Sequence, residues 1–153
     1  MRVRKAGLKD VDELKELYFN LMLRFEKMDS FDTQDRKYWK TKAKAHLRRL
    51  IRGKEDDFLV LEEDKKIIGF SQVKMIKREP IFKIKTDPHI EATFIRPEYR
   101  GKGYGKILFN ESVKFLRKKG AKYITVGTHA KDAGANSFWK NMGFKEYNIK
   151  YRK

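Results

Sequence analysis

Residues 95–106 read Ile-Arg-Pro-Glu-Tyr-Arg-Gly-Lys-Gly-Tyr-Gly-Lys and stand between a predicted strand and a predicted helix. Gly101, Gly103 and Gly105 occupy alternate positions in this stretch. Because glycine has no side chain, the backbone can turn tightly there and point several N–H groups toward one ligand. The helix that follows begins with unpaired N–H groups, and its dipole favours a bound anion. Positive charge is added by Arg100, Lys102 and Lys106. The stretch therefore predicts a cradle for a pyrophosphate.

Two familiar phosphate motifs do not fit this loop. A P-loop needs Gly-Lys-Ser/Thr at a fixed distance after its first glycine, and that triplet is missing here. The dinucleotide fingerprint needs its last glycine where Lys106 stands, and it belongs to the opening strand–helix–strand unit of a fold. A glycine-rich loop alone is also compatible with a basic surface turn, and that alternative stays open at this point.

Hydrophobic spacing predicts the elements around the loop. A helix is expected at 10–28, with Asp10 and Glu13 as a capping box, and another at 34–52, with Gly53 as its stop. The remaining elements are strands at 3–8, 58–61, 67–73, 90–95, 123–126 and 144–151, a hairpin turn at 63–66, an extended piece at 81–84, and helices at 106–119 and 133–142. This order predicts an α/β (α+β) fold, a mixed sheet with helices on both faces.

Composition limits the class of protein. The 153 residues suit one domain, 1–153, and the absence of cysteine excludes disulfides, Cys-bound metals and a cysteine nucleophile. Lys and Arg number 38 against 21 Asp and Glu, and this net charge of +17 attracts polyanions such as nucleic acid, although it also suits solubility alone. Without a signal-peptide core or a membrane-length apolar stretch, we expect a cytoplasmic protein that uses no metal and no membrane.

Two motifs together resemble a known family. The pattern Arg100-x-x-Gly103-x-Gly105 resembles the Arg/Gln-x-x-Gly-x-Gly/Ala motif of the GNAT superfamily of N-acetyltransferases. Residues 135–144, which end in Gly143-Phe144, resemble the last-helix motif of the same family. The order of elements matches over essentially the whole chain. The resemblance implies a central mixed sheet that is splayed between two strands, with acetyl-CoA as donor and direct attack by a primary amine in a ternary complex.

The resemblance also implies cofactor-binding residues. Backbone groups near the end of the 90–95 strand would pair with the pantetheine arm, and the glycine loop would hold the pyrophosphate. Asp132 stands where the family usually has an asparagine, and Trp139 stands where it usually has a tyrosine acid, so Trp139 is read as a wall of the site. The complete set is Phe94, Ile95, Arg96, Arg100, Gly101, Lys102, Gly103, Tyr104, Gly105, Lys106, Asp132, Asn136 and Trp139.

An amine acceptor sets the remaining requirements. A lysine-like ammonium has a pKa of about 10.4, so a base must remove a proton before attack. Glu91 is the first candidate, because it lies in the strand that faces the expected site. His89 lies two residues earlier on the same face, and His129 follows the next strand. A solvent-facing carboxylate and a loop histidine are the simpler alternatives for Glu91 and His129.

The acceptor itself is left open by the sequence. The turn between the first two helices carries an acidic patch, which binds a cationic amine or only caps the next helix; its candidates are Glu26, Asp29 and Asp32. Small amines, antibiotics, polyamines and proteins all stay open, and so does the oligomeric state, for which the resemblance makes a homodimer one option because dimers are common in the family. The alternatives are a non-enzymatic nucleic-acid-binding domain that uses the all-positive stretch 36–54, and an acetyltransferase recruited to a ribosomal or RNA-bound acceptor.

Overall fold

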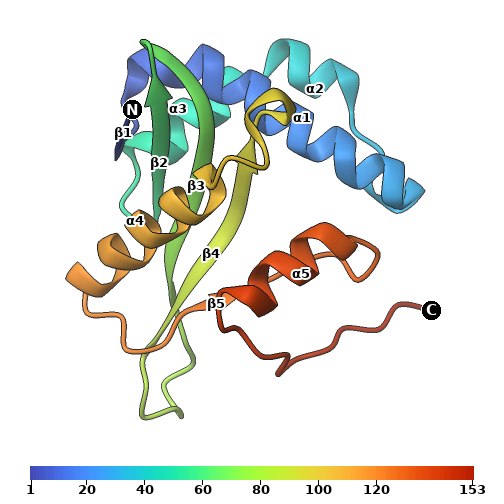
Figure 1. Ribbon diagram of the computed structural model, residues 1–153. Helices are drawn as coiled ribbons and strands as arrows, with labels where there is room; N and C mark the ends of the chain where they lie inside the picture. The colour runs from blue at the N-terminus through green and yellow to red at the C-terminus, as the bar shows by residue number, and fades with distance from the viewer.

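The computed structural model describes all 153 residues and contains one five-stranded sheet in the order β1-β2-β3-β4-β5 (Figure 1). Its strands are β1 (Arg2–Lys5), β2 (Asp56–Glu63), β3 (Lys66–Lys77), β4 (Thr86–Ile95) and β5 (Thr125–Val126). Neighbouring strands are antiparallel except β4 and β5, which are parallel. The sheet is therefore mixed, as predicted.

Five α-helices and three short 3₁₀ turns complete the fold. The helices are α1 (Val11–Met28), α2 (Arg36–Thr41), α3 (Ala43–Arg52), α4 (Tyr104–Lys118) and α5 (Ala133–Asn141), and the 3₁₀ turns are Leu8–Asp10, Ser30–Asp32 and Pro97–Tyr99. Helix α4 lies on the opposite side of the sheet from α1 and α3 (Figure 1). No helix is both long and apolar enough to span a membrane.

Alternation along β2 gives each face of the sheet its own core. Phe58 and Val60 pack with Leu14 and Leu47 of the α1 and α3 layer. Leu59 and Leu61 point to the other face, where they pack with Leu108 of α4. Because both faces are buried, β2 reads as an unbroken apolar run, and the register of the sheet is strongly specified.

A bulge changes the alternation in β4. Gln72 of β3 pairs with Ala92, but the next residue, Val73, pairs with Ile90, so Glu91 has no residue opposite it. The extra residue returns Ile90 and Ile95 to the same face, and both pack toward α4. The bulge thus places Glu91 at the point where the strand is irregular.

The hairpin prediction is confirmed, and the long second helix is wrong. Asp64 and Lys65 both have positive φ angles, 48° and 65°, which matches a two-residue turn between β2 and β3. The 34–52 segment is two helices, α2 and α3, interrupted at Lys42, whose φ of −119° departs from the usual helical value although the residue stays in the right-handed region. Gly53 ends α3 in an extended conformation, so no left-handed glycine stop is present.

Three predictions made near the ends of elements are also wrong. Asp10 does not cap α1, since its carboxylate accepts from the Gly7 N–H and pairs with Arg4, while Glu13 accepts from the Ile67 N–H. Burial and hydrogen bonding explain the difference: Asp10 is buried against a guanidinium, whose hydrogen bonds hold the pKa of Asp10 below its usual range. The first strand correspondingly ends at Lys5.

Neither the 81–84 piece nor the 144–151 strand forms. Residues 81–84 make the exposed tip between β3 and β4, and Ile81 there is 84% exposed. The C-terminal segment alternates in sequence but does not pair with β5. Instead Arg152 bonds to Asp29 and stacks over Phe31, so an ion pair replaces strand pairing.

Candidate active site

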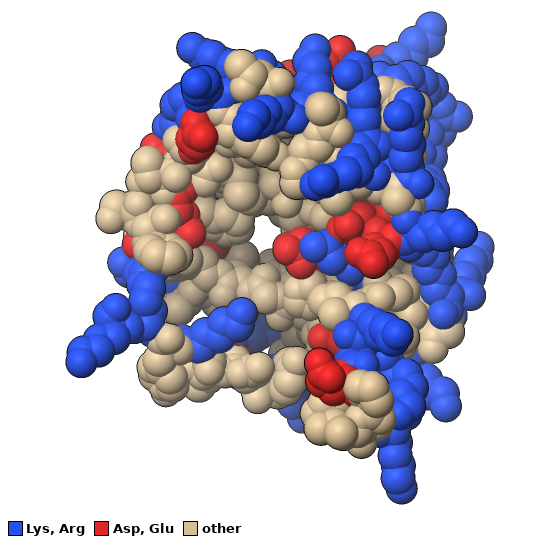
Figure 2. Space-filling model, turned by 180° about the vertical axis from the view of Figure 1, so that it is seen from behind, with Lys and Arg blue, Asp and Glu red and all other residues tan.

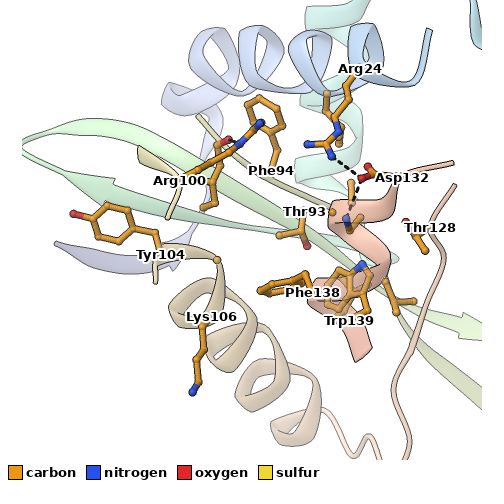
Figure 3. A pocket seen from close by; sticks show the side chains of 18 of the residues that line it. Arg24, Thr93, Phe94, Arg100, Tyr104, Lys106, Thr128, Asp132, Phe138 and Trp139 are labelled. Atoms are coloured by element: carbon orange, nitrogen blue, oxygen red, sulfur yellow. Dashed lines mark hydrogen bonds and ion pairs between the residues drawn. The ribbon is translucent and has the colours of Figure 1, made fainter. Parts of the chain in front are cut away.

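A cavity of about 520 Å³ opens where β4 and β5 separate. The two strands pair only at His89 with Thr125 and at Ile90 with Val126, whereas β4 continues to Ile95. The gap is lined by residues of α1, β4, the glycine loop, the start of α4, β5 and α5 (Figure 3). The splay that the sequence resemblance implied is therefore present in this sheet.

The glycine loop forms one end of the cavity. Gly101 and Gly103 adopt left-handed φ angles of 77° and 81°, and Gly103 stands immediately before the first residue of α4. The N–H groups of residues 101–105 donate to no carbonyl or side chain of the chain. Unpaired N–H groups at the start of a 15-residue helix are the donors that a phosphate accepts from, so this end fits a pyrophosphate.

The third glycine has a packing role. A side chain at Gly105 would meet the Phe138 ring, whose Cε2 atom lies 3.4 Å from the position of a Cβ atom. At this distance a Cβ atom would make an ordinary van der Waals contact, so Gly105 marks where the start of α4 lies beside α5. Gly101 and Gly103 of the motif supply the left-handed turns of the loop, and Gly105 faces Phe138 of α5.

Arg100 lies beside this loop and faces the cavity. Its Nε donates to the Ile95 carbonyl at 2.9 Å, and its guanidinium lies over the Phe94 ring. Burial and the neighbouring Arg24 cation lower the pKa of Arg100. The Arg100 guanidinium adds positive charge beside the unpaired N–H groups of the loop.

The lysines and the tyrosine of the loop play smaller parts. Lys102 does not line the cavity and lies over the Tyr99 ring, while the side chains of Tyr104 and Lys106 point away from the cavity in Figure 3. The Tyr104 hydroxyl donates to Glu63, and this hydrogen bond raises the pKa of Tyr104. Tyr104 and Lys106 therefore line the cavity with their backbone and not with the ends of their side chains.

Glu91, the unpaired residue of the β4 bulge, is one of the residues that line the cavity. Its Oε2 atom lies 3.5 Å from Nζ of Lys74 and 3.7 Å from Nε2 of His89. Its side chain is 38% exposed, so solvent and substrate both reach it. A carboxylate that both substrate and solvent can reach is able to accept a proton from an ammonium group.

Helix α5 forms the opposite wall. The rings of Phe138 and Trp139 face the cavity, and Trp139 also packs edge-on against Phe109 and Phe144 (Figure 3). Trp139 therefore lines the cavity and also belongs to the hydrophobic core. It has no phenolic hydroxyl, so it cannot act as the acid that a tyrosine would supply. Asp132 accepts from the Ala135 N–H at 2.9 Å and caps α5.

Arg24 is a cavity residue that the sequence argument missed. Its Nη2 atom lies 2.6 Å from Oδ1 of Asp132. This ion pair joins α1 to the cap of α5, and both of its residues line the cavity (Figure 3). Arg24 continues the apolar stripe of α1, since it follows Leu21 by three residues. A charged residue on a buried stripe was the available signal. Other lining residues that were not predicted as site residues are Leu21, Phe25, Ile90, Ala92, Thr93, Val126, Gly127, Thr128, Gly134, Ala135 and Phe138.

Several predicted residues lie outside the cavity. Arg96 pairs with Glu16, and Asn136 donates to the carbonyls of His129 and Asp132, so it braces the loop before α5. His89 does not line the cavity, and its Nε2 atom lies 3.7 Å from Oε2 of Glu91. His129 accepts from the Lys131 N–H through Nδ1, with Nε2 3.7 Å from Asp29.

The acidic patch does not reach the cavity either. Glu26 is held by Arg36 at 2.7 Å and by the Gln34 N–H, and Asp32 lies beside it in the turn after α1. Asp29 binds Arg152, and that guanidinium together with the Phe31 N–H lowers the pKa of Asp29 to about 2. Glu26 and Asp29 thus have cationic partners from the chain itself.

Comparison with known proteins gives a consistent result. The pattern of the Acetyltransferase (GNAT) family matches residues 15–144. An uncharacterized N-acetyltransferase, MJ1207 of Methanocaldococcus jannaschii, is 27% identical over 96% of this chain, which spans 62% of that relative's length. A putative [ribosomal protein bS18]-alanine N-acetyltransferase of Bacillus subtilis is 24% identical over 97% of this chain and 83% of its own length.

Solved structures share the fold. The aminoglycoside N-acetyltransferase AAC(6')-Iy in complex with CoA superimposes with a TM-score of 0.75. The comparison covers 99% of this chain and 98% of the other, at 16% sequence identity. At such low identity the likeness concerns the fold, and the cavity described above lies within the shared part.

Proposed function

This chain belongs to the acetyltransferase (GNAT) family, and we propose that it transfers the acetyl group of acetyl-CoA to an amine. The observation that carries the proposal is the set of unpaired N–H groups at residues 101–105, which opens into the gap between β4 and β5. The non-enzymatic nucleic-acid alternative is not favoured, because the family match spans both the glycine loop and α5.

The cavity can hold acetyl-CoA in one orientation. The N–H groups of the glycine loop and the Arg100 guanidinium would bind the pyrophosphate. Beyond Ile90 the edge of β4 that faces β5 has no strand partner, although the other edge stays paired with β3. The backbone groups on the open edge are free to pair with the pantetheine amides. Phe138 and Trp139 would line the apolar arm and the thioester.

Glu91 is the proposed general base. It takes a proton from the acceptor ammonium, and the amine nitrogen then attacks the thioester carbonyl carbon. The C–N bond forms as the C–S bond breaks, and N–H groups on the open edge of β4 can stabilise the oxyanion. Of the two protons that the ammonium loses, one ends on the CoA thiol and the other is released.

The acceptor is proposed to be a peptide or protein amine and not a polycation. A polyamine or an aminoglycoside needs carboxylates to bind its charges. Glu26 and Asp29, at the end of α1, already pair with Arg36 and Arg152. Lys and Arg side chains cover much of one face of the molecule, which repels cationic acceptors (Figure 2). A relative whose name assigns it an alanine of a ribosomal protein supports the same class and the recruitment alternative.

A cytoplasmic location and a homodimer complete the proposal. Acetyl-CoA is made and used inside cells, which supports the location. A homodimer is supported by the free outer edge of β5 and by the exposed side chains of Tyr147, Ile149 and Tyr151 after α5. Light scattering after gel filtration tests the dimer, and a monomer at all concentrations would remove it from the proposal.

Two measurements test the function. Acetyl-CoA at 100 times its Kd should stabilise the fold by about 2.7 kcal/mol, a rise in Tm of roughly 5–10 °C for a chain of this size. Release of free thiol should then be measured with N-terminal peptides, lysine peptides, spermidine and an aminoglycoside. No rise in Tm would refute acetyl-CoA binding, and turnover only with the polycations would refute the acceptor class.

A further inference from the structure

Behind Glu91 lies a row of polar side chains that the proposed reaction has not used. Asp87 and His89 come from β4, and Thr125 comes from β5. The Thr125 hydroxyl lies 2.7 Å from Nδ1 of His89 and donates to Oδ1 of Asp87 at 2.6 Å. His89 and Thr125 are direct partners in the short paired stretch of β4 and β5, so the sheet itself fixes this contact.

The hydrogen bonds determine which nitrogen of His89 carries the proton. A threonine hydroxyl has one hydrogen, and a carboxylate only accepts, so the Thr125 hydrogen is committed to Asp87. The 2.7 Å contact with His89 is then a bond in which Nδ1–H donates to the Thr125 oxygen. In the neutral ring, Nε2 is therefore the free base, and it lies 3.7 Å from Oε2 of Glu91.

We propose that Asp87 and Thr125 hold His89 in this tautomer so that Nε2 takes over the proton that Glu91 removes from the acceptor amine. The proposal rests on the proposed function and extends it. The proton passes from the ammonium to Glu91 and then to His89, which restores the carboxylate, and His89 gives it to solvent. The 3.7 Å separation closes by side-chain movement or is bridged by a water molecule.

The surroundings favour passing the proton on. Lys74 of β3 lies 3.5 Å from both Glu91 and Asp56 of β2, so its ammonium group is shared between two carboxylates. Burial and the Glu91 carboxylate raise the pKa of Tyr18 on α1 to about 12, so the phenol stays neutral. Asp87, through Thr125, supplies the negative charge that compensates an imidazolium at His89.

The relay assigns different roles to neighbouring groups. Glu91 lines the cavity and can touch the acceptor, whereas His89 does not line it and is 19% exposed. His89 acts through Glu91, and Asp87 and Thr125 act through His89, so these three are positioning residues. The partial exposure of His89 lets it pass the proton to solvent.

Nitrogen-15 NMR of the histidine rings in the free enzyme tests the tautomer directly. The chain has three histidines, and His89→Gln assigns the resonances of His89. At a pH where the rings are neutral, we expect Nδ1–H for His89. The opposite tautomer is expected for His129, whose Nδ1 accepts from the Lys131 N–H. An Nε2–H ring at His89 would overturn the proposal, whatever the acceptor is.

The kinetic test uses Thr125→Val with Thr125→Ser as its matched control. Valine keeps the shape and loses the hydroxyl, so kcat should fall about 10-fold near pH 6.5, and the loss should shrink as pH rises and more amine is already neutral. Serine keeps the hydroxyl and should stay within about 2-fold of wild type. Both variants should bind acetyl-CoA normally.

Each outcome of these tests is decisive. A kcat profile of Thr125→Val that superimposes on wild type, or an equal defect in Thr125→Ser, would refute the relay. If Thr125→Val does not fold, the wild-type tautomer still decides whether His89 is positioned as described. A wild-type enzyme that turns over no acetyl-CoA would refute the proposed function and the relay step, while the same NMR spectrum would still report the tautomer.

Discussion

At one end of the cavity, the glycine end (residues 100–106), the groups available to a ligand are mostly backbone N–H groups without partners. At the other, the ion-pair end (Arg24, Glu91 and Asp132), they are side chains that already contact each other or their neighbours. The glycine end is encoded by consecutive residues, whereas Arg24 and Asp132 are 108 positions apart. Substitutions at the glycine end should therefore change binding, and those at the ion-pair end should change stability or chemistry.

The largest effect is expected from Gly103→Asp. Its carboxylate would repel the pyrophosphate, and the Kd for acetyl-CoA should rise by about 100-fold or more. The left-handed φ of 81° adds a folding cost of about 1–2 kcal/mol. Calorimetric titration and urea unfolding measure the two effects separately.

Gly120→Asp is the matched control for this change. Gly120 has a φ of 90° and open space around its Cβ position, so it carries the same strain at the far end of α4. It should lose similar stability and keep wild-type affinity. Equal losses of affinity in the two variants would show that strain, and not contact with the ligand, governs binding.

The contrast between the two ends explains what the sequence could predict. The glycine loop was found because its function depends on backbone conformation, which three alternating glycines specify locally. Trp139 and Asp132 were found through the resemblance to the family, Trp139 within the last-helix motif and Asp132 shortly before it. Most of the sheet and the long helices followed from periodicity, since both faces of β2 and the stripe of α1 are buried.

Ion pairs between residues that are far apart in the sequence could not be read in this way. Glu26 and Asp29 were predicted to bind the acceptor, but Arg36 and Arg152 occupy them, and no local pattern in the sequence announces those pairings. The C-terminal segment, which ends in this contact of Arg152, forms no strand. Pairing between distant charges depends on the finished topology, which is why Arg24 was also missed.

Glu91→Gln should show the next largest effect. Loss of the base should lower kcat/KM for the amine by about 10²–10³-fold at pH 7, with acetyl-CoA affinity unchanged. The defect should shrink toward pH 10, where more amine is neutral. Glu111→Gln, on the outer face of α4 beside Lys114, is the control and should behave as wild type. A pH-independent defect would instead assign Glu91 to binding of the ammonium.

A smaller effect is expected at Asp132, where stability and not binding should change. Asp132→Ala loses both the α5 cap and the Arg24 pair, so unfolding should become about 1–2 kcal/mol easier. Asp132→Asn keeps an oxygen for the Ala135 N–H and should lose less. Urea unfolding curves of the two variants make the comparison, and equal losses would mean that the cap contributes nothing.

The smallest effect is expected at Arg152. The hydrogen bonds of Arg152 and of the Phe31 N–H hold the pKa of Asp29 near 2, below its unfolded value of about 3.9. Stability from this interaction is therefore present above about pH 4 and is lost as pH falls through 2. Arg152→Gln should raise the pKa of Asp29, and its Tm should differ from wild type only above that window. An unchanged pKa by NMR would contradict the contact.

Titration with acetyl-CoA and with S-acetylpantetheine, which lacks the pyrophosphate, tests most directly whether the glycine end holds that group. We predict that the wild-type protein binds acetyl-CoA about 100-fold more tightly, and that this ratio falls below about 10 in Gly103→Asp. Equal affinities of the wild-type protein for the two ligands would contradict the assignment of residues 100–106 to the pyrophosphate.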